Sequence, residues 1–154
     1  MLEYMEMIMI LNLNKPVGWT SFDVVKKVRS IIKEKKVGHG GTLDPFAEGV
    51  LIIGTGKDTK KLTSITNADK TYIARICLGE ITDTLDTEGK VIATKPVPKI
   101  NVADIHKVLN SFLGISCQIP PMFSAKKVNG QRLYKIARKN IEVKREPINI
   151  NIKS

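Results

Sequence analysis

The sequence has few of the residues that build metal, cofactor and disulfide sites. It contains only 2 cysteines in 154 residues, Cys77 and Cys117, and they lie far apart. This spacing argues against a metal site and a disulfide framework, so a reducing compartment such as the cytoplasm is expected. Cys77 lies in an apolar stretch and is predicted to be a small core residue. Phosphate-binding and dinucleotide-binding glycine motifs are also missing, which predicts no nucleotide cofactor.

Aromatic residues and long apolar runs are scarce as well. Phe, Trp and Tyr make up 5% of the chain, which argues against an extended aromatic platform for single-stranded nucleic acid. No stretch is long and apolar enough for a transmembrane helix, and the first ten residues lack the basic start of a secretory signal peptide. We therefore expect a cytoplasmic protein that does not engage a membrane.

Positive charge, in contrast, is abundant. The chain has 25 Lys plus Arg against 15 Asp plus Glu, a formal net charge of +10. This excess favours a polyanionic partner. Nucleic acid is the first candidate and an anionic membrane is the second. A lysine-rich, solvated surface explains the same charge. The hydrophobic share of 42% is enough for a real core, and the length fits one domain.

Hydrophobic periodicity predicts a mixture of strands and helices. Strands are expected at about 8–13, 50–53, 70–78, 91–94 and 148–152. Helices are expected at about 20–36, 57–64, 101–114 and 132–139. Thr20 and Asn101 each precede an aspartate by three residues, which is typical of a helix N-terminus. The predicted core residues of these helices include Phe22, Val25, Val28, Ile32, Val102, Ile105, Leu109 and Phe112.

The run from Val37 to Leu51 holds one aspartate, Asp44, in a glycine-rich segment. Pro45 biases Asp44 toward an extended conformation. A buried strand is expected directly after the run, so the segment has the form of a loop that presents one acid from a rigid base. An aspartate before a proline is also a common turn residue. The glycines, which allow close approach to a ligand or unusual backbone angles, are Gly38, Gly40, Gly41 and Gly49.

This run resembles the aspartate motif of the TruB family of tRNA pseudouridine synthases, which convert uridine 55 of the tRNA T loop to pseudouridine. The resemblance rests on Gly38-His39, Leu43-Asp44-Pro45, Ala47, Gly49 and Leu51. Further segments resemble the family in the same order. They are Asn14-Lys15-Pro16 with Thr20-Ser21, Lys70-Thr71-Tyr72, Thr82-Asp83-Thr84 with Asp86, Gln118-Ile119-Pro120-Pro121, and Leu133-Tyr134 with Ala137-Arg138.

The resemblance implies an α+β pseudouridine synthase fold, with a mixed, mostly antiparallel sheet and flanking helices. It implies that residues 1–154 are the N-terminal part of the catalytic domain, with an RNA-gripping insertion at 118–145. The family's later Gly-Thr-Tyr-Ile-Arg segment and the PUA domain of many members have no counterpart in the sequence. A non-catalytic RNA-binding module that needs the missing half is therefore the alternative expectation. A basic, ribosome-associated structural protein is a third.

By resemblance, Asp44 is the catalytic nucleophile and the T stem-loop of tRNA is the partner. The carboxylate would attack the ribose C1′ or the uracil C6, or abstract a proton to give a glycal, and the sequence leaves these routes open. The reaction breaks a glycosidic bond and forms a carbon–carbon bond without oxidation or phosphorylation. No cofactor and no metal are therefore expected.

The resemblance also implies roles for residues around the substrate. Tyr72 would stack on the flipped uracil and His39 would fill the space left by flipped bases, while Lys15 neighbours the site and Asp86 contacts RNA. Their simpler interpretations are a core tyrosine, a loop hydrogen-bonding group and two solvated charges. Contacts to the RNA backbone are expected from the insertion, where a charged helix surface is the alternative. The basic residues concerned are Lys126, Lys127, Arg132 and Arg138, with Lys135 and Lys139 nearby.

Overall fold

The computed structural model of the protein describes residues 8–124, 126–128, 130–139 and 141–154. The chain divides into two compact units, Met1–Arg75 and Ile76–Ser154, and each is described by itself. None of the helices in those ranges combines the length and the apolar character that a membrane crossing requires.

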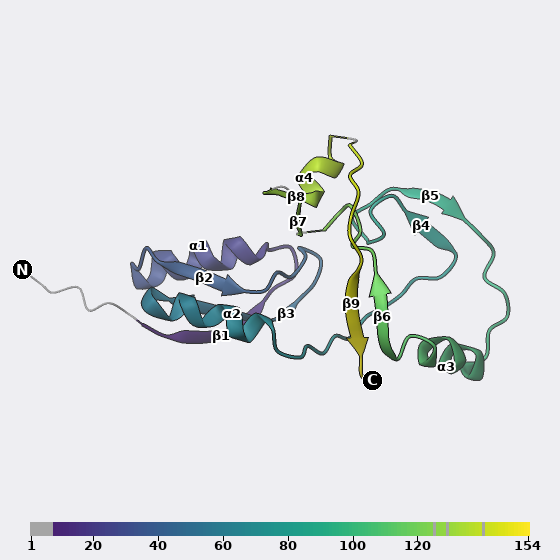
Figure 1. Ribbon diagram of the computed structural model, residues 1–154, viewed down its shortest axis with the longest axis horizontal. Helices are drawn as coiled ribbons and strands as arrows, with labels where there is room; N and C mark the ends of the chain where they lie inside the picture. The colour runs from purple at the N-terminus through teal and green to yellow at the C-terminus, as the bar shows by residue number, and fades with distance from the viewer. Residues whose placement is uncertain (1–7, 125, 129, 140) are drawn as a thin grey trace, which may run out of the picture. The chain divides into compact units, whose positions relative to one another are not determined.

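A three-stranded antiparallel sheet forms the centre of the first unit (Figure 1). Its strands are β1 (Ile10–Lys15), β2 (Val37–Gly40) and β3 (Gly49–Thr55), in the order β1-β3-β2. In the central strand β3, Leu51 pairs with β1, and Ile53 lies between β1 and β2. The most apolar strand therefore lies in the middle, where both of its edges are hydrogen-bonded and Ile53 is completely buried.

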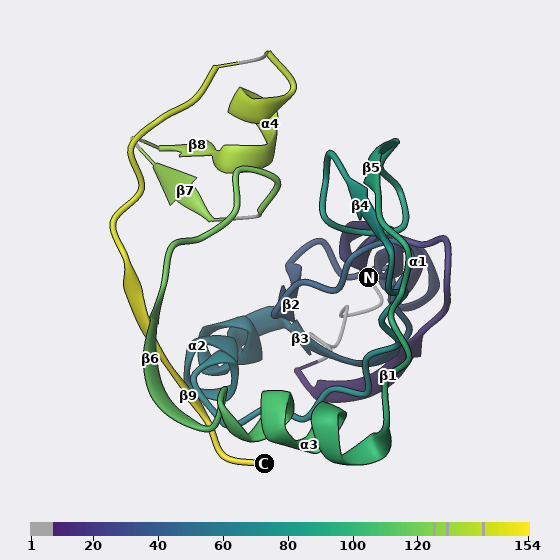
Figure 2. The same cartoon turned by 90° about the vertical axis from the view of Figure 1, so that its right-hand side faces the viewer.

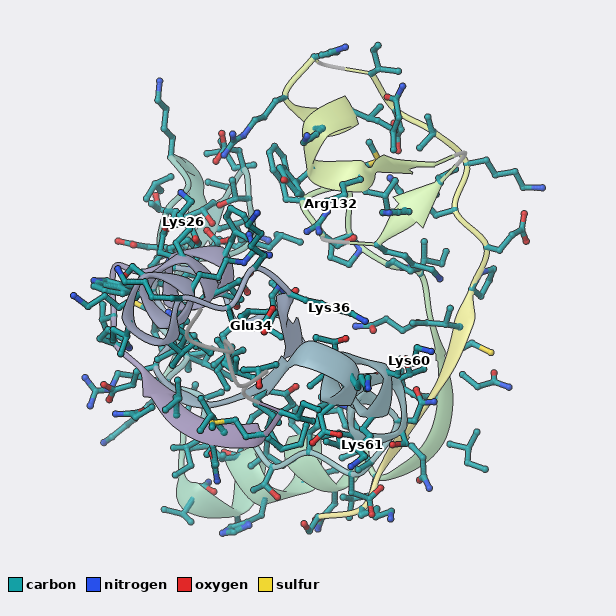
Figure 3. The ribbon with its side chains drawn as sticks, turned by 90° about the vertical axis from the view of Figure 1, so that its left-hand side faces the viewer. Lys26, Glu34, Lys36, Lys60, Lys61 and Arg132 are labelled. Carbon is teal, nitrogen blue, oxygen red and sulfur yellow. The ribbon has the colours of Figure 1, made fainter. Side chains whose placement is uncertain are left out.

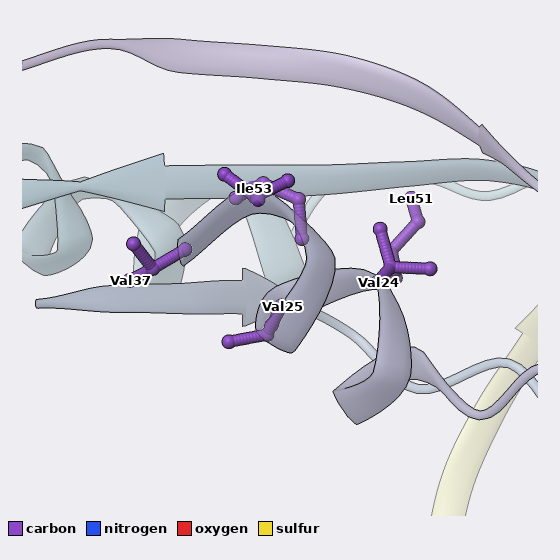
Figure 4. Close-up of a cluster of buried hydrophobic side chains, with 6 residues drawn as sticks. Val24, Val25, Val37, Leu51 and Ile53 are labelled. Atoms are coloured by element: carbon purple, nitrogen blue, oxygen red, sulfur yellow. The ribbon is translucent and has the colours of Figure 1, made fainter. Parts of the chain in front are cut away.

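Helix α1 (Ser21–Ile32) covers one face of this sheet, and local signals set both of its ends. The Thr20 hydroxyl accepts from the Asp23 amide at 3.1 Å, which confirms the predicted N-terminus, and the Asp23 carboxylate accepts from the Thr20 amide, so the two residues form a capping box. The helix ends at Ile32, earlier than expected, because Lys33 takes a left-handed conformation with φ 55°. Figure 4 shows the core that it covers, made of Val24, Val25, Val28, Val37, Leu51 and Ile53.

The predicted apolar face of α1 is confirmed at Val25, Val28 and Ile32, which lie in or against the core, and is wrong at Phe22. Val24, Val25 and Val28 are buried, whereas Phe22 is 49% exposed. The Phe22 ring lies beneath two cations, with Lys26 Nζ 5.1 Å and Arg29 Cζ 5.8 Å from its centroid. A cationic side chain over an aromatic face is favourable, so Phe22 is accommodated at the surface.

The opposite face of the sheet is covered by the 3₁₀ helix η1 (Gly56–Lys61) and helix α2 (Leu62–Thr66). A Cβ placed on Gly40 would come within 3.2 Å of the Leu62 side chain, and one placed on Gly54 would meet backbone atoms at 3.1 Å. Gly38 also faces Leu62 and Thr59. Gly38 and Gly40 therefore let a helix approach the strand, and only part of the glycine run serves the Asp44 loop.

The strand expected over Lys70–Leu78 is not formed. Residues 69–77 have no regular secondary structure, and the side chains of Tyr72 and Ile73 are largely solvent-exposed. Alternating hydrophobicity predicts a strand only if a neighbouring strand is available. No strand in the described ranges pairs with this segment. Cys77 is exposed for the same reason, which corrects its predicted place in the core.

The second unit consists of small antiparallel pairs and short helices. β6 and β9 run side by side in Figure 2, with Gly114 opposite Ile152 and Gln118 opposite Ile148. The β4–β5 pair carries an irregularity beside Ile81. The elements are β4 (Glu80–Thr82), β5 (Val91–Thr94), α3 (Val102–Asn110), β6 (Gly114–Gln118), β7 (Lys127–Val128), β8 (Gln131–Arg132), α4 (Leu133–Ala137) and β9 (Ile148–Ile152).

Burial in the second unit departs from the prediction for α3. Asn101 caps this helix with a capping box to Asp104, as expected. Its predicted core stripe is nevertheless exposed, with Ile105 at 46% and Phe112 at 58%. The cap and the periodicity determine that a helix forms, whereas burial depends on which element packs against it. Among the described residues of this unit, the buried apolar ones are Leu133 and Ala137 of α4 and Pro120.

The predicted α+β class is confirmed. Helices flank strands in both units, and every strand pair in the described ranges is antiparallel. The strands form one three-stranded sheet and three two-stranded sheets.

Candidate functional site

Asp44 lies on the loop of residues 41–48, which joins β2 to β3 in the first unit. Asp44 is an exposed residue. Its backbone carbonyl oxygen accepts a hydrogen bond from the Ala47 amide at 3.1 Å, which forms a turn. The loop begins and ends at glycines in the left-handed region, Gly41 with φ 109° and Gly49 with φ 130°. Only glycine takes such angles readily, so these two positions fix the path of the loop.

Hydrogen bonds hold the backbone on both sides of Asp44. Before it, the Leu43 amide donates to Ser21 Oγ at 3.0 Å, and the Leu43 carbonyl accepts from the same hydroxyl at 3.3 Å. After it, the Pro45 carbonyl accepts from the Gly18 amide at 2.7 Å. The carboxylate is thus presented to solvent from a backbone that is attached to the segment leading into α1.

Lys15 lies beneath this loop with no solvent-exposed surface. Its ammonium donates to the carbonyls of Trp19 at 2.7 Å, Pro16 at 2.9 Å and Pro45 at 3.4 Å. An ammonium has three hydrogens, so these acceptors use all of its donors. One side chain therefore joins the turn after β1 to the residue that follows Asp44.

The charge of Lys15 is also part of the site. Burial lowers the pKa of Lys15 below its ordinary value of 10.5, and the nearby carboxylates of Asp44 and Glu48 oppose this effect by attracting the ammonium. The sequence predicted Lys15 as a neighbour that binds substrate. The structure places it next to the catalytic candidate, but under the loop, where it contacts protein carbonyls.

His39 lies in β2, two residues before the loop begins. Its Nδ1 is in close hydrogen-bond contact with the carbonyl oxygen of Gly41. A carbonyl oxygen can only accept, so this contact places the proton on Nδ1. The imidazole therefore supports the first residue of the loop from the strand, and His39, Lys15 and Asp44 gather at one end of the sheet.

Tyr72 and Asp86 are placed differently. Tyr72 is 70% exposed in an irregular segment, and among the described residues no hydrogen bond or ring contact joins it to the Asp44 loop. Asp86 belongs to the second unit, where its Oδ1 accepts from Thr84 Oγ1 at 2.6 Å and from the Glu88 amide at 2.9 Å. These bonds make Asp86 an organiser of the turn between β4 and β5, and its contact with RNA stays a prediction.

The predicted RNA-contacting residues come together in one hairpin of the second unit. Lys127 in β7 and Arg132 in β8 are direct cross-strand partners. The Lys126 carbonyl accepts from the Leu133 amide at 2.8 Å, which joins the hairpin to α4. Arg138 follows this helix, with its guanidinium 5.6 Å from the Tyr134 ring centroid. The insertion predicted at 118–145 includes residues 125, 129 and 140, which lie outside the described residues.

Two contributions to the site did not emerge from the sequence as functional residues. Ser21 and the Gly18 amide hold the peptides that flank Asp44. The feature of the sequence that could have indicated a role for Ser21 is the Thr20-Ser21 pair at the start of the helix. Since Thr20 already serves as the cap, the second hydroxyl is free to bond elsewhere.

The described part of the chain contains no cluster of three or more His, Cys, Asp or Glu side chains arranged to hold a metal ion. The structure places the buried ammonium of Lys15 near the exposed Asp44 carboxylate, and the His39 imidazole contacts Gly41 at the start of the same loop. This set suits acid–base or nucleophilic chemistry by one carboxylate.

Comparison with known proteins identifies the family of this chain. The sequence model for the TruB family pseudouridylate synthases, N-terminal domain, matches residues 29–154. The chain belongs to the TruB family. The match includes His39, Asp44 and the basic hairpin, and it confirms the resemblance read from the motifs.

Curated relatives agree with this assignment. The chain is 54% identical over 137 residues to tRNA pseudouridine synthase B of Bacillus subtilis (strain 168), covering 88% of the chain and 44% of that protein. It is 51% identical over 138 residues to tRNA pseudouridine synthase B of Dehalococcoides mccartyi (strain ATCC BAA-2100 / JCM 16839 / KCTC 5957 / BAV1), covering 90% of the chain and 46% of that protein. The chain thus spans about half the length of these relatives.

The fold is also similar to that of a chain in the solved structure of a Cbf5-Nop10-Gar1 complex. The TM-score is 0.56 at 24% sequence identity, over 92% of this chain and 32% of the compared chain. This likeness shows that the two chains share a fold.

Proposed function

We propose that this protein acts in the isomerisation of uridine 55 in the tRNA T loop to pseudouridine, with Asp44 as the catalytic carboxylate. The TruB family and the name of its relatives, tRNA pseudouridine synthase B, support the reaction class. The observation that carries the assignment of Asp44 is its presentation: the side chain is exposed, while the peptides on both sides are held by Ser21, Gly18 and Lys15.

The chemistry asks for one carboxylate in a fixed position. Attack on the ribose C1′, attack on the uracil C6 and proton abstraction toward a glycal all begin at an Asp44 oxygen that approaches a base turned out of its stack. The ammonium of Lys15 supplies positive charge beneath the loop. Tyr72 would stack on the flipped uracil and His39 would occupy space vacated by bases, both from the first unit.

Binding of the tRNA backbone is proposed for the β7–β8 hairpin. Lys127 and Arg132 lie directly opposite each other, and like charges in this arrangement disfavour the hairpin. A phosphate group between or above them would remove this repulsion. Lys126 and Arg138 extend the same basic segment, and Asp86 would contact the RNA from the β4–β5 turn.

The first unit carries positive charge of its own. The Gly56 amide donates to the Lys36 carbonyl at 2.8 Å, so the start of β2 adjoins the start of η1. Lys36, Lys60 and Lys61 come from these adjoining segments and are labelled in Figure 3. Two basic regions, one in each unit, fit a polyanion that is longer than one binding site.

A second candidate function follows from the length of the chain. Since it spans about half of its relatives, it would bind tRNA without modifying it if catalysis needs the rest of the protein. The first candidate predicts modification by this chain and the second predicts binding alone.

Asp44→Asn separates the two candidates, with Asp58→Asn as the matched control in the same unit. Asp58 lies in η1, outside the Asp44 loop, where its partly buried carboxylate forms an ion pair with Lys61 at 2.7 Å. We expect Asp44→Asn to abolish pseudouridine formation on an unmodified tRNA transcript and to leave tRNA affinity within about twofold, because a carboxylate acting on the base adds little binding. Binding by all forms and modification by none would favour the second candidate. Modification that survives in Asp44→Asn would contradict the first.

A further inference from the structure

We propose that Ser21 is a positioning residue whose hydroxyl holds the peptide directly before Asp44 and so sets where the carboxylate stands. The inference rests on the proposed function of Asp44. It adds a residue that never touches the substrate and acts through the loop backbone.

The geometry of Ser21 is specific for this task. The residue is 3% exposed, and its Oγ lies 3.0 Å from the Leu43 amide nitrogen and 3.3 Å from the Leu43 carbonyl oxygen. A hydroxyl has one hydrogen to donate and lone pairs that accept, so it serves both groups at once. Both polar backbone groups of the residue before Asp44 are therefore bonded to one side chain.

The base that carries this hydroxyl is itself rigid. Ser21 is the first residue of α1, and the capping role at this helix end is taken by Thr20. Val24 and Val25, less than two turns further on, are buried in the core. The Ser21 hydroxyl is thus free of helix capping and fixed by the packing of the helix against the sheet.

The loop needs such a tether because Asp44 is itself exposed. On its other side, the Pro45 carbonyl is held by the Gly18 amide and by Lys15. Removing the Ser21 hydroxyl leaves the residue before Asp44 without its hydrogen bonds to α1, while the loop keeps the attachment at Pro45, the Ala47 turn and the His39 contact with Gly41. The Leu43–Asp44 peptide can then rotate, and a reacting group displaced by about 1 Å loses on the order of 100-fold in rate.

A merely structural role makes a different prediction from a positioning role. If Ser21 only stabilised the fold, Ser21→Ala would lower the free energy of unfolding, while the folded fraction would react at the original rate. If it positions Asp44, the folded protein reacts slowly with unchanged tRNA affinity. A rate measured at saturating enzyme, together with the tRNA dissociation constant, separates these cases.

The experiment compares Ser21→Ala, Ser21→Thr and the control Ser30→Ala in the full chain. Ser30 lies on the same helix, is exposed, and donates to its own helix at the Lys27 carbonyl, 2.8 Å away. We expect Ser21→Ala to slow single-turnover pseudouridine formation about 10- to 100-fold. The tRNA dissociation constant should stay unchanged and Ser30→Ala should behave as the parent. Ser21→Thr, which keeps a hydroxyl, should recover most of the rate.

A second readout does not depend on activity. Hydrogen exchange of the Leu43 amide should accelerate in Ser21→Ala and stay at the parent level in Ser30→Ala. A parent rate in Ser21→Ala, or a rate loss with unchanged Leu43 exchange, would overturn the proposal. If the parent chain makes no pseudouridine, the proposed function fails for this chain, and exchange at Leu43 alone then decides whether Ser21 holds the loop.

Discussion

Lys15 places a positive charge inside the fold, directly beneath the loop that carries an exposed carboxylate. Its side chain is fully buried and its three donors are used by the carbonyls of Pro16, Trp19 and Pro45. The motif around Asp44 could be read from the sequence because it is local. The burial of Lys15 could not, because it depends on how the turn after β1 and the Asp44 loop meet in space.

Lys15→Met tests this arrangement through stability. The substitution keeps an unbranched side chain but removes the ammonium that donates to three backbone carbonyls, and loss of these charged hydrogen bonds costs about 1–3 kcal/mol. Urea denaturation should show this loss in the free energy of unfolding. The control Lys27→Met replaces an exposed lysine of α1 and should change it by less than about 0.5 kcal/mol. Equal stability of Lys15→Met and the parent would show that the ammonium does not hold the loop.

The pH dependence of this contribution has a defined sign. Because burial lowers the pKa of Lys15 below 10.5, the unfolded chain binds more protons than the folded chain between the two values. Lys15 therefore makes the protein more stable as the pH rises through the alkaline range toward 10.5. Unfolding measured across that range should show this rise in the parent and its absence in Lys15→Met. An identical pH profile in both would contradict it.

At the scale of elements, local sequence signals predicted where helices begin, whereas packing between distant segments decided which side chains are buried. The caps at Thr20 and Asn101 were predicted from short-range patterns and are present. The prediction of a strand at Lys70–Leu78 was wrong. Alternating hydrophobicity leads to a strand only where a partner strand is present, and no short-range pattern specifies that partner. The apolar stripe of α3 was predicted as core and is exposed for the same reason.

Thr20→Ala tests the element that carries Ser21. Loss of an N-cap hydroxyl costs about 1 kcal/mol of stability. Thermal or urea unfolding followed by circular dichroism should show this loss. Thr63→Ala, an exposed threonine in α2, serves as the control and should change stability little. A Thr20→Ala protein as stable as the control would show that core packing alone holds the helix end.

At the scale of the whole molecule, basic regions in both units determine the expected partner. The net charge of +10 favours a polyanionic partner. Charge alone is explained equally well by a lysine-rich surface that contacts only solvent. The cross-strand pair of Lys127 and Arg132 supports the proposal of an anionic partner, because opposing like charges weaken a hairpin and a bound anion would relieve the repulsion. The sequence predicted the cluster of basic residues. Only the structure shows the hairpin register that places these two side chains opposite each other.

The salt dependence of tRNA binding tests this pair. If Arg132 contacts a phosphate, Arg132→Gln should weaken binding uniformly across RNA sequences and reduce the slope of log K against log salt concentration by about 1. Filter binding at several salt concentrations measures this slope. Lys99→Gln is the matched control, since Lys99 is an exposed lysine of the same unit outside residues 118–145. The same slope for Arg132→Gln and the parent would exclude a phosphate contact at this position.

The most direct test of the central claim is to map pseudouridine in an unmodified tRNA transcript after a single turnover with this chain and with Asp44→Ala. We predict pseudouridine at position 55 with the parent chain and none with Asp44→Ala, while both bind the transcript. Product formed equally by the two proteins, or formed at other uridines only, would contradict the assignment of Asp44 and its site.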